Sequence, residues 1–130
     1  QGLCVLDLDT VMPGLAAFDF GDLVRSGANT GAEDETNLQK VGLSLESYRA
    51  LQRGFLDACG DTLTEAERTS LTLGGKLMTL ECGVRFLTDY LSGDTYFRVH
   101  RPQHNLERCR CQLQLVRSME VQWDAMVHCD

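Results

Sequence analysis

The stretch that decides the fold is residues 64–93, TEAERTSLTLGGKLMTLECGVRFLTDYLSG. It begins with Thr64 and Glu67, a pair with the spacing of a capping box at a helix start. It ends at Gly93, a residue type common just after the last helical turn. Between them, apolar residues recur every three or four positions, and these are Leu73, Leu77, Leu80, Val84, Leu87 and Leu91. We therefore predict one long helix whose apolar stripe packs against another helix.

Helical periodicity also extends to both sides of this stretch. Ser44 and Asn105 are of the residue types that cap helix starts, and Gly60 follows the last periodic residue of its segment. The polar, glycine-containing segment between the first two helices indicates a loop. The sequence thus predicts a single, mainly α domain over 1–130 with about four helices, at 15–26, 44–59, 64–91 and 105–127, and a loop at 27–42.

The chain opens with an apolar run over residues 3–8, which predicts a short leading β-strand or hairpin. This strand would present the carboxylates of Asp7 and Asp9 at its end, and Asp19 and Asp22 follow a Pro-Gly turn. Because a strand is rarely stable alone, it needs a partner, and pairing with a second copy of the chain would give a homo-oligomer. Residues 95–99 are β-prone as well.

Charge and hydropathy exclude several functional classes. The 130 residues carry a net charge of −7, which disfavours nucleic-acid binding because that requires a basic face. No apolar run approaches the ~20 residues that span a bilayer, so we expect no membrane insertion. Residues 1–36 hold seven acids and one arginine, whereas 98–110 are basic. This asymmetry suits a metal-and-phosphate site, and a solvated helix start is the alternative explanation of the basic run.

Six cysteines occur without a Cys-x-x-Cys pair. Their density is lower than in disulfide-stapled secreted domains, so we expect free thiols in a reducing cytoplasm. A zinc site from Cys109, Cys111, His128 and Cys129 is the alternative, although its spacing fits no standard zinc pattern.

Several motifs together resemble the aminoglycoside-phosphotransferase-like kinases, and most of all their N-acetylhexosamine 1-kinase branch, which includes proteins labelled mucin desulfatase. The similarity covers nearly the whole chain. It is carried by VLDLDTVMPG at 5–14, DFGD at 19–22, GANTGAEDE at 27–35, ECGVRFLTDYL at 81–91, GDTYF at 93–97 and HNL at 104–106.

This resemblance implies the helical C-terminal, substrate lobe of a two-lobe, protein-kinase-like fold. The family's ATP-gripping N-lobe is absent from the chain, and so is its His-x-Asp-x-x-x-x-Asn loop, which supplies the catalytic base. We therefore expect no catalytic base in this chain and no turnover by the fragment alone. The intact parent would use ATP and Mg²⁺ to phosphorylate a hydroxyl of a small-molecule acceptor, a sugar similar to N-acetylhexosamine.

The resemblance also assigns roles to particular residues. Asp7 matches the metal-holding aspartate, and Asp9 becomes a second ligand or an outer-shell acceptor. Asp19 resembles a buried aspartate that braces the catalytic loop, and Asp22 does the same or faces water. Arg85 and Tyr96 match the positions that contact the sugar in these kinases.

Each assignment has a structural alternative. Arg85 is spaced to form an ion pair with Glu81 on one helix face, and Tyr96 could be a core aromatic. His104 and Asn105 are most simply a helix cap. Ser26 stands where relatives often carry an aromatic residue, which leaves the acceptor's identity open. For the whole chain, the alternative to an enzyme is a non-catalytic helical interaction module whose apolar stripes face a partner.

Overall fold

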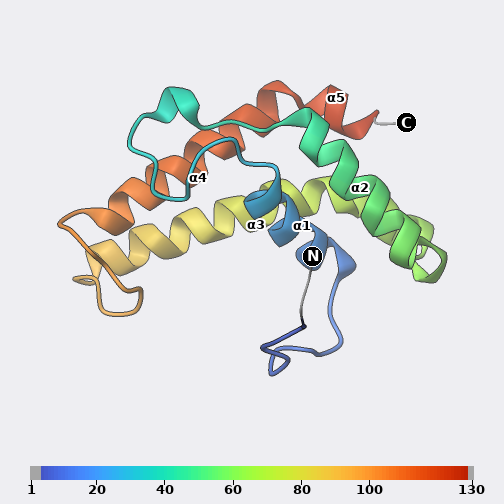
Figure 1. Ribbon diagram of the computed structural model, residues 1–130, viewed down its shortest axis with the longest axis horizontal. Coiled ribbons are helices and arrows are strands. Elements are labelled where there is room, and N and C mark those ends of the chain that lie inside the picture. Colours follow the sequence, from blue (N-terminus) through green and yellow to red (C-terminus); the bar gives the residue numbers. More distant parts are fainter. Residues whose placement is uncertain (1–3, 129–130) are drawn as a thin grey trace.

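The computed structural model describes residues 4–128. This part of the chain is mainly helical, as predicted. Figure 1 shows the two longest helices, α3 and α4, lying side by side along the molecule. The loop 92–103 joins them at one end of the molecule, and α2 lies at the opposite end. α1 crosses α3. The α-helices are α1 (Ala16–Gly27), α2 (Leu45–Cys59), α3 (Glu65–Leu91), α4 (His104–Val121) and α5 (Trp123–Val127), and short 3-10 turns cover Leu38–Lys40 and Gly60–Thr62.

The predicted starts of α2 and α3 are confirmed. The Ser44 side chain accepts a hydrogen bond of 3.2 Å from the Ser47 amide. At α3 the capping box is complete, because Thr64 Oγ1 accepts from the Glu67 amide at 3.3 Å and Glu67 Oε2 accepts from the Thr64 amide at 2.8 Å. These bonds satisfy amides that have no partner within the helix.

The prediction for the last helix misplaces its start and misses a break within it, although α5 ends at the predicted Val127. α4 begins at His104 after Gln103, whose backbone is left-handed with φ of 65°. Asn105 lies inside the helix and is fully buried, so it is not the N-cap. The helix also breaks at Gln122, whose side-chain amide donates to the Leu43 carbonyl at 3.0 Å. The sequence pattern could not show this contact with a distant loop.

The predicted leading strand is wrong for the part of it that the structure describes. Cys4–Leu8 form no β-ladder, and within residues 4–128 the only β-bridge joins Asn29 to Leu43. Leu3 lies outside the described residues. Val5 and Leu6 are 79% and 77% exposed, because no neighbouring strand covers them. Pairing of two copies through this segment stays a prediction. The β-prone segment 95–99 is likewise a loop.

α3 does not bury the face that the apolar stripe predicts. Leu73 and Val84 on the stripe are more than half exposed, and Leu91 is 75% exposed. The helix instead packs on α1 and α4 through a face rich in small residues. The buried residues of that face are Leu71, Thr72, Gly74, Gly75, Thr79, Gly83, Phe86 and Asp89.

The crossing of α1 and α3 is a contact between main chains. A Cβ atom placed on Gly74 would lie 2.0 Å from the Ala17 carbonyl oxygen, and one on Gly21 would lie 2.3 Å from the Gly74 carbonyl oxygen. No side chain fits between the helices at this point. Small residues therefore decide which face of α3 turns inward, even though larger apolar residues lie on the opposite side.

The core fills the space where α1, α2, α3, α4 and α5 approach one another. Phe20 packs edge-on against Tyr48, with ring centroids 5.9 Å apart. The Tyr48 hydroxyl forms a 2.9 Å hydrogen bond with Thr72 Oγ1, which removes the cost of burying a phenol. Other large apolar side chains that are fully buried include Leu71, Leu115, Met119 and Met126. Of the helices in residues 4–128, none has the length and apolar character needed to cross a membrane.

Candidate functional site

Arg85 and Tyr96, both predicted to contact a substrate, meet at one cavity. Arg85 extends from α3, and Tyr96 belongs to the loop 92–103. The Arg85 guanidinium carbon lies 5.8 Å from the centre of the Tyr96 ring and 5.5 Å from that of Phe97. These residues line a cavity of about 410 Å³ together with Asp89. Tyr96 is 74% exposed, so the alternative that it is a core aromatic is wrong.

The predicted ion pair between Arg85 and Glu81 also forms, at 3.6 Å between Nε and Oε1. Both side chains remain about half exposed, at 49% and 46%. An exposed pair of this kind contributes little to stability. It leaves the rest of the Arg85 guanidinium available to the cavity.

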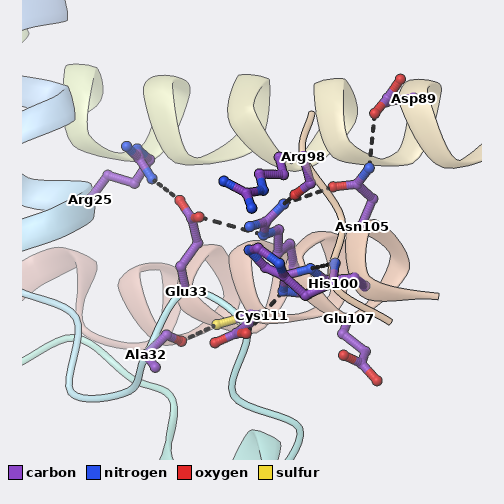
Figure 2. Close-up of polar contacts among 12 residues, drawn as sticks. Arg25, Ala32, Glu33, Asp89, Arg98, His100, Asn105, Glu107 and Cys111 are labelled. Atoms are coloured by element: carbon purple, nitrogen blue, oxygen red, sulfur yellow. Dashed lines mark hydrogen bonds and ion pairs between the residues drawn. The ribbon is translucent and has the colours of Figure 1, made fainter. Parts of the chain in front are cut away.

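Asp89 holds the loop that carries Tyr96. Its carboxylate accepts the backbone N–H groups of Thr95, Tyr96 and Phe97 at 2.8–2.9 Å, and the side-chain amide of Asn105 at 2.8 Å. Figure 2 shows the contact between Asp89 and Asn105. Burial opposes the charge on Asp89, but the three backbone donors prevail and lower its pKa. The position of the Tyr96 ring is therefore set by one buried carboxylate, a role that the sequence analysis missed.

Asp7 and Asp9 lie on the exposed segment before α1. Asp7 adopts a left-handed backbone with φ of 64°, which non-glycine residues visit seldom. Neither residue lines the cavity of Arg85 and Tyr96. Among residues 4–128, no group of three or more His, Cys, Asp or Glu side chains lies close enough to hold a metal ion. The structure thus keeps the predicted metal ligands apart from the predicted acceptor residues.

Asp19 and Asp22, the predicted supporting acids, both lie in α1 with exposed side chains. Asp19 is in the first turn, where a negative charge interacts favourably with the helix dipole. Asp22 accepts a 2.8 Å hydrogen bond from Arg25 Nε. The bracing role of Asp19 toward a catalytic loop outside this chain stays a prediction, and Asp22 pairs with an arginine of its own helix.

His104 ties the loop 27–42 to α4, and the predicted capping role for it is wrong. The imidazole is 2% exposed, and its Nε2 lies 2.9 Å from Asp34 Oδ2. Because its Nδ1 accepts the His100 amide at 3.3 Å, the proton lies on Nε2 and is donated to Asp34. Arg101 Nη2 adds a 3.1 Å ion pair to the same carboxylate. The hydrogen bond from His104 lowers the pKa of Asp34 most, and the nearby charge of Arg101 lowers it further.

The cysteines of the described chain are free, as expected. They are Cys4, Cys59, Cys82, Cys109 and Cys111, and Cys129 lies outside the described residues. Cys111 donates to the Ala32 carbonyl at 3.1 Å, and burial raises the pKa of both the Cys109 and the Cys111 thiol. Thiols in this state are poor metal ligands, because the thiolate is the form that binds.

A comparison of the chain with models of known protein families gave no match.

Proposed function

We propose that this chain is the acceptor-binding part of an ATP-dependent phosphotransferase that phosphorylates a sugar hydroxyl. The observation that carries the proposal is the meeting of Arg85 and Tyr96 at one cavity. The resemblance assigned both residues to the sugar, and they come from separate elements, α3 and the loop 92–103.

The cavity suits a sugar in size and chemistry. Its volume of about 410 Å³ falls in the range of small-molecule sites. A phenol ring offers an apolar face to the C–H groups of a sugar and a hydroxyl at its edge. Arg85 offers paired N–H donors that match vicinal hydroxyl oxygens. Because the Asp89 hydrogen bonds fix the loop in advance, little ordering remains to oppose binding.

Asp7 and Asp9 fit the second part of the proposal, which is metal binding. Carboxylates are the ligands that Mg²⁺ prefers, and it usually takes one or two of them beside the phosphates of a nucleotide. The left-handed backbone at Asp7 is of the kind that clusters at ligand-holding positions. When bound, Mg²⁺ would neutralise charge on the transferring phosphates. The resemblance places the catalytic base outside this chain.

The acceptor role is tested with Arg85→Ala in the full-length parent protein. Because Arg85 would touch the acceptor alone, the substitution should raise the acceptor KM far more than the KM for ATP. Arg53→Ala, on the exposed face of α2, is the matched control and should change neither. Equal effects of Arg85→Ala on both KM values would mean that Arg85 is structural.

The metal role is tested with Asp7→Asn, which removes one charge without changing size. Turnover by the full-length parent should be abolished, while its thermal unfolding stays the same, since Asp7 is exposed. Asp57→Asn in α2 serves as a control of equal charge change. Wild-type turnover by Asp7→Asn would refute the metal assignment. We place this activity in the cytoplasm, where free thiols persist and ATP and Mg²⁺ are available.

A second function, a non-catalytic interaction module, is favoured by the exposed apolar side chains of α3 and of the segment before α1. Such a module would bind another protein tightly, and the stability of the complex would not depend on Mg²⁺. Size-exclusion chromatography with and without Mg²⁺, together with phosphate transfer from ATP by the intact parent, separates the two functions.

A further inference from the structure

A second cavity, of about 310 Å³, lies beside the first, and Arg85 lines both. Its wall brings together arginines from four separate segments: α1, α3, the loop 92–103 and α4. Glu33 is the one acid lining this cavity among the residues that the structure describes. The arginines are Arg25, Arg85, Arg98 and Arg108, and His100 lies among them. None of the sequence-based assignments accounts for this arrangement.

The carboxylates around the cavity do not balance these arginines. Glu33 lies between Arg25 Nη1, at 3.1 Å, and Arg108 Nε, at 3.7 Å. Figure 2 shows Glu33 reaching toward Arg25, with Arg98 and His100 on its other side. At the rim, Asp22 pairs with Arg25 and Glu81 with Arg85. Across residues 4–128, no carboxylate lies within ion-pair distance of Arg98, so an unpaired positive charge faces the cavity.

Arg108 has a buried donor that makes no hydrogen bond within the described residues. Arg108 Nη1 donates to the Arg98 carbonyl at 3.2 Å and to Asn105 Oδ1 at 3.1 Å, whereas its buried Nε has no hydrogen-bond partner among the described residues. The Arg108 guanidinium carbon lies 5.4 Å from the centre of the Phe86 ring. The Arg85 guanidinium carbon lies 5.5 Å from the centre of the Phe97 ring. Stacking on an aromatic ring helps to hold each guanidinium group in place without using its N–H donors.

A smaller polar cavity of about 150 Å³ adjoins this one, and Arg25 and Glu33 line both. Gln112 of α4 lines the smaller cavity and is 1% exposed. Its Oε1 is buried and receives no hydrogen bond from the described residues. A buried acceptor of this kind costs free energy unless a donor reaches it. The hydroxyl group of a ligand would supply that donor.

We propose that the arginine-lined cavity binds the phosphate group of a phosphate monoester. Arg25, Arg98 and Arg108 donate N–H groups to the phosphate oxygens, since planar guanidinium groups match such oxygens in pairs. A hydroxyl on the carrier of the phosphate donates to Gln112 Oε1. The same chemistry is presented by a sugar phosphate and by free inorganic phosphate. The proposal needs only this geometry and stands apart from the phosphotransferase proposal.

Isothermal titration of the chain with inorganic phosphate, glucose 6-phosphate and glucose tests the proposal. Both phosphates should bind saturably, and any binding of glucose should be unaffected by Arg98→Gln. Arg98→Gln should raise the Kd for phosphate by about tenfold or more, which is the usual effect of losing a charge-assisted hydrogen bond. Because Arg98 is exposed, this variant should fold normally. Arg53→Gln on α2 removes the same charge elsewhere and should change the Kd by less than about twofold.

Cys82 lines the cavity and gives an independent readout. Either phosphate should slow the alkylation of Cys82 by iodoacetamide and should leave alkylation of the exposed Cys4 unchanged. Peptide mass spectrometry measures both rates. Tighter binding of glucose 6-phosphate than of phosphate identifies a sugar phosphate as the ligand, and equal affinity identifies free phosphate. The proposal is overturned if phosphate does not saturate, or if Arg98→Gln and Arg53→Gln weaken binding equally.

Discussion

At Gly74, the main chain of α3 touches the main chain of α1 with no side chain between them. This residue has more influence on the fold than any leucine of the apolar stripe, because it allows the two helices to approach. Its importance cannot be derived from helix propensity, which counts glycine inside a helix as a defect. Only the position of Ala17 in space explains it.

Gly74→Ala should lower the free energy of unfolding by at least about 2 kcal/mol, because the new methyl group meets backbone atoms that cannot rotate away. Gly54→Ala in α2 is the matched control. No atom lies within 4 Å of a Cβ placed there, so the exchange should stabilise the protein by up to about 1 kcal/mol. Urea unfolding of both variants checks the prediction. Similar effects at the two glycines would contradict the close crossing.

Asp89 makes the stability of the protein depend on pH. Its folded pKa is lowered, so its contribution is fully present above the ordinary pKa of an aspartate and is lost as the pH falls through the folded value. Asp89→Asn should therefore destabilise the protein at pH 7, and its difference from the wild type should shrink as the pH is lowered toward 3.

Urea unfolding at several pH values measures this difference, with Asp57→Asn in α2 as the exposed control. Asparagine keeps one oxygen, which can still accept from Thr95 and Tyr96, so hydrogen exchange should speed up most at the Phe97 amide, which donates to the other carboxylate oxygen. A difference that stays constant with pH would show that the charge of Asp89 is not what holds the loop.

At the scale of the element, the helices were predictable where the signal is local. The capping residues of α2 and α3 act on amides three residues away, so the sequence alone places them. The start of α4 was not predictable, because Asn105 is held by Asp89 of another helix. The inward face of α3 was mispredicted because it also depends on another helix. The spacing of the leucines indicates a face that could be buried, but the glycines on the other face allow closer packing against α1.

Leu71→Ala and Leu73→Ala test which face of α3 is buried, with the same chemical change two residues apart. Leu71 is 1% exposed, so its truncation should cost about 2–5 kcal/mol. Leu73 is 54% exposed, and its truncation should cost less than about 1 kcal/mol. Thermal or urea unfolding of the isolated chain distinguishes them. The reverse order would mean that the leucine stripe is the buried face.

At the scale of the whole molecule, the fold is a helical assembly to which the first described residues contribute little. The segment before α1 exposes Val5, Leu6 and Val11 and forms no strand. Fold class and helix number were therefore close to what the sequence indicated, whereas the strand was wrong because a β-prone run specifies no partner. Of the candidate site, the resemblance assigned Arg85 and Tyr96 each to the acceptor but not their contact with each other. The arginine-lined cavity was not predicted, since its residues come from four segments.

Removal of the chain up to Gly14 should leave the melting temperature of the remainder within about 2 °C of the original, because residues 4–14 are exposed. Circular dichroism at 222 nm follows the transition. The shortened chain should also aggregate less, since exposed apolar side chains are lost. A fall of more than about 5 °C would show that the segment packs on the helices in solution.

The crossing of α1 with α3 also has a kinetic consequence. α3 and α4 are joined by the loop 92–103 and can meet early. The chain between α1 and α3, residues 28–64, is much longer and must form a closed loop before α1 contacts α3. Closure of that long segment costs chain entropy before any packing repays it. We therefore expect the helical hairpin of α3 and α4 to form before α1 docks at its glycines.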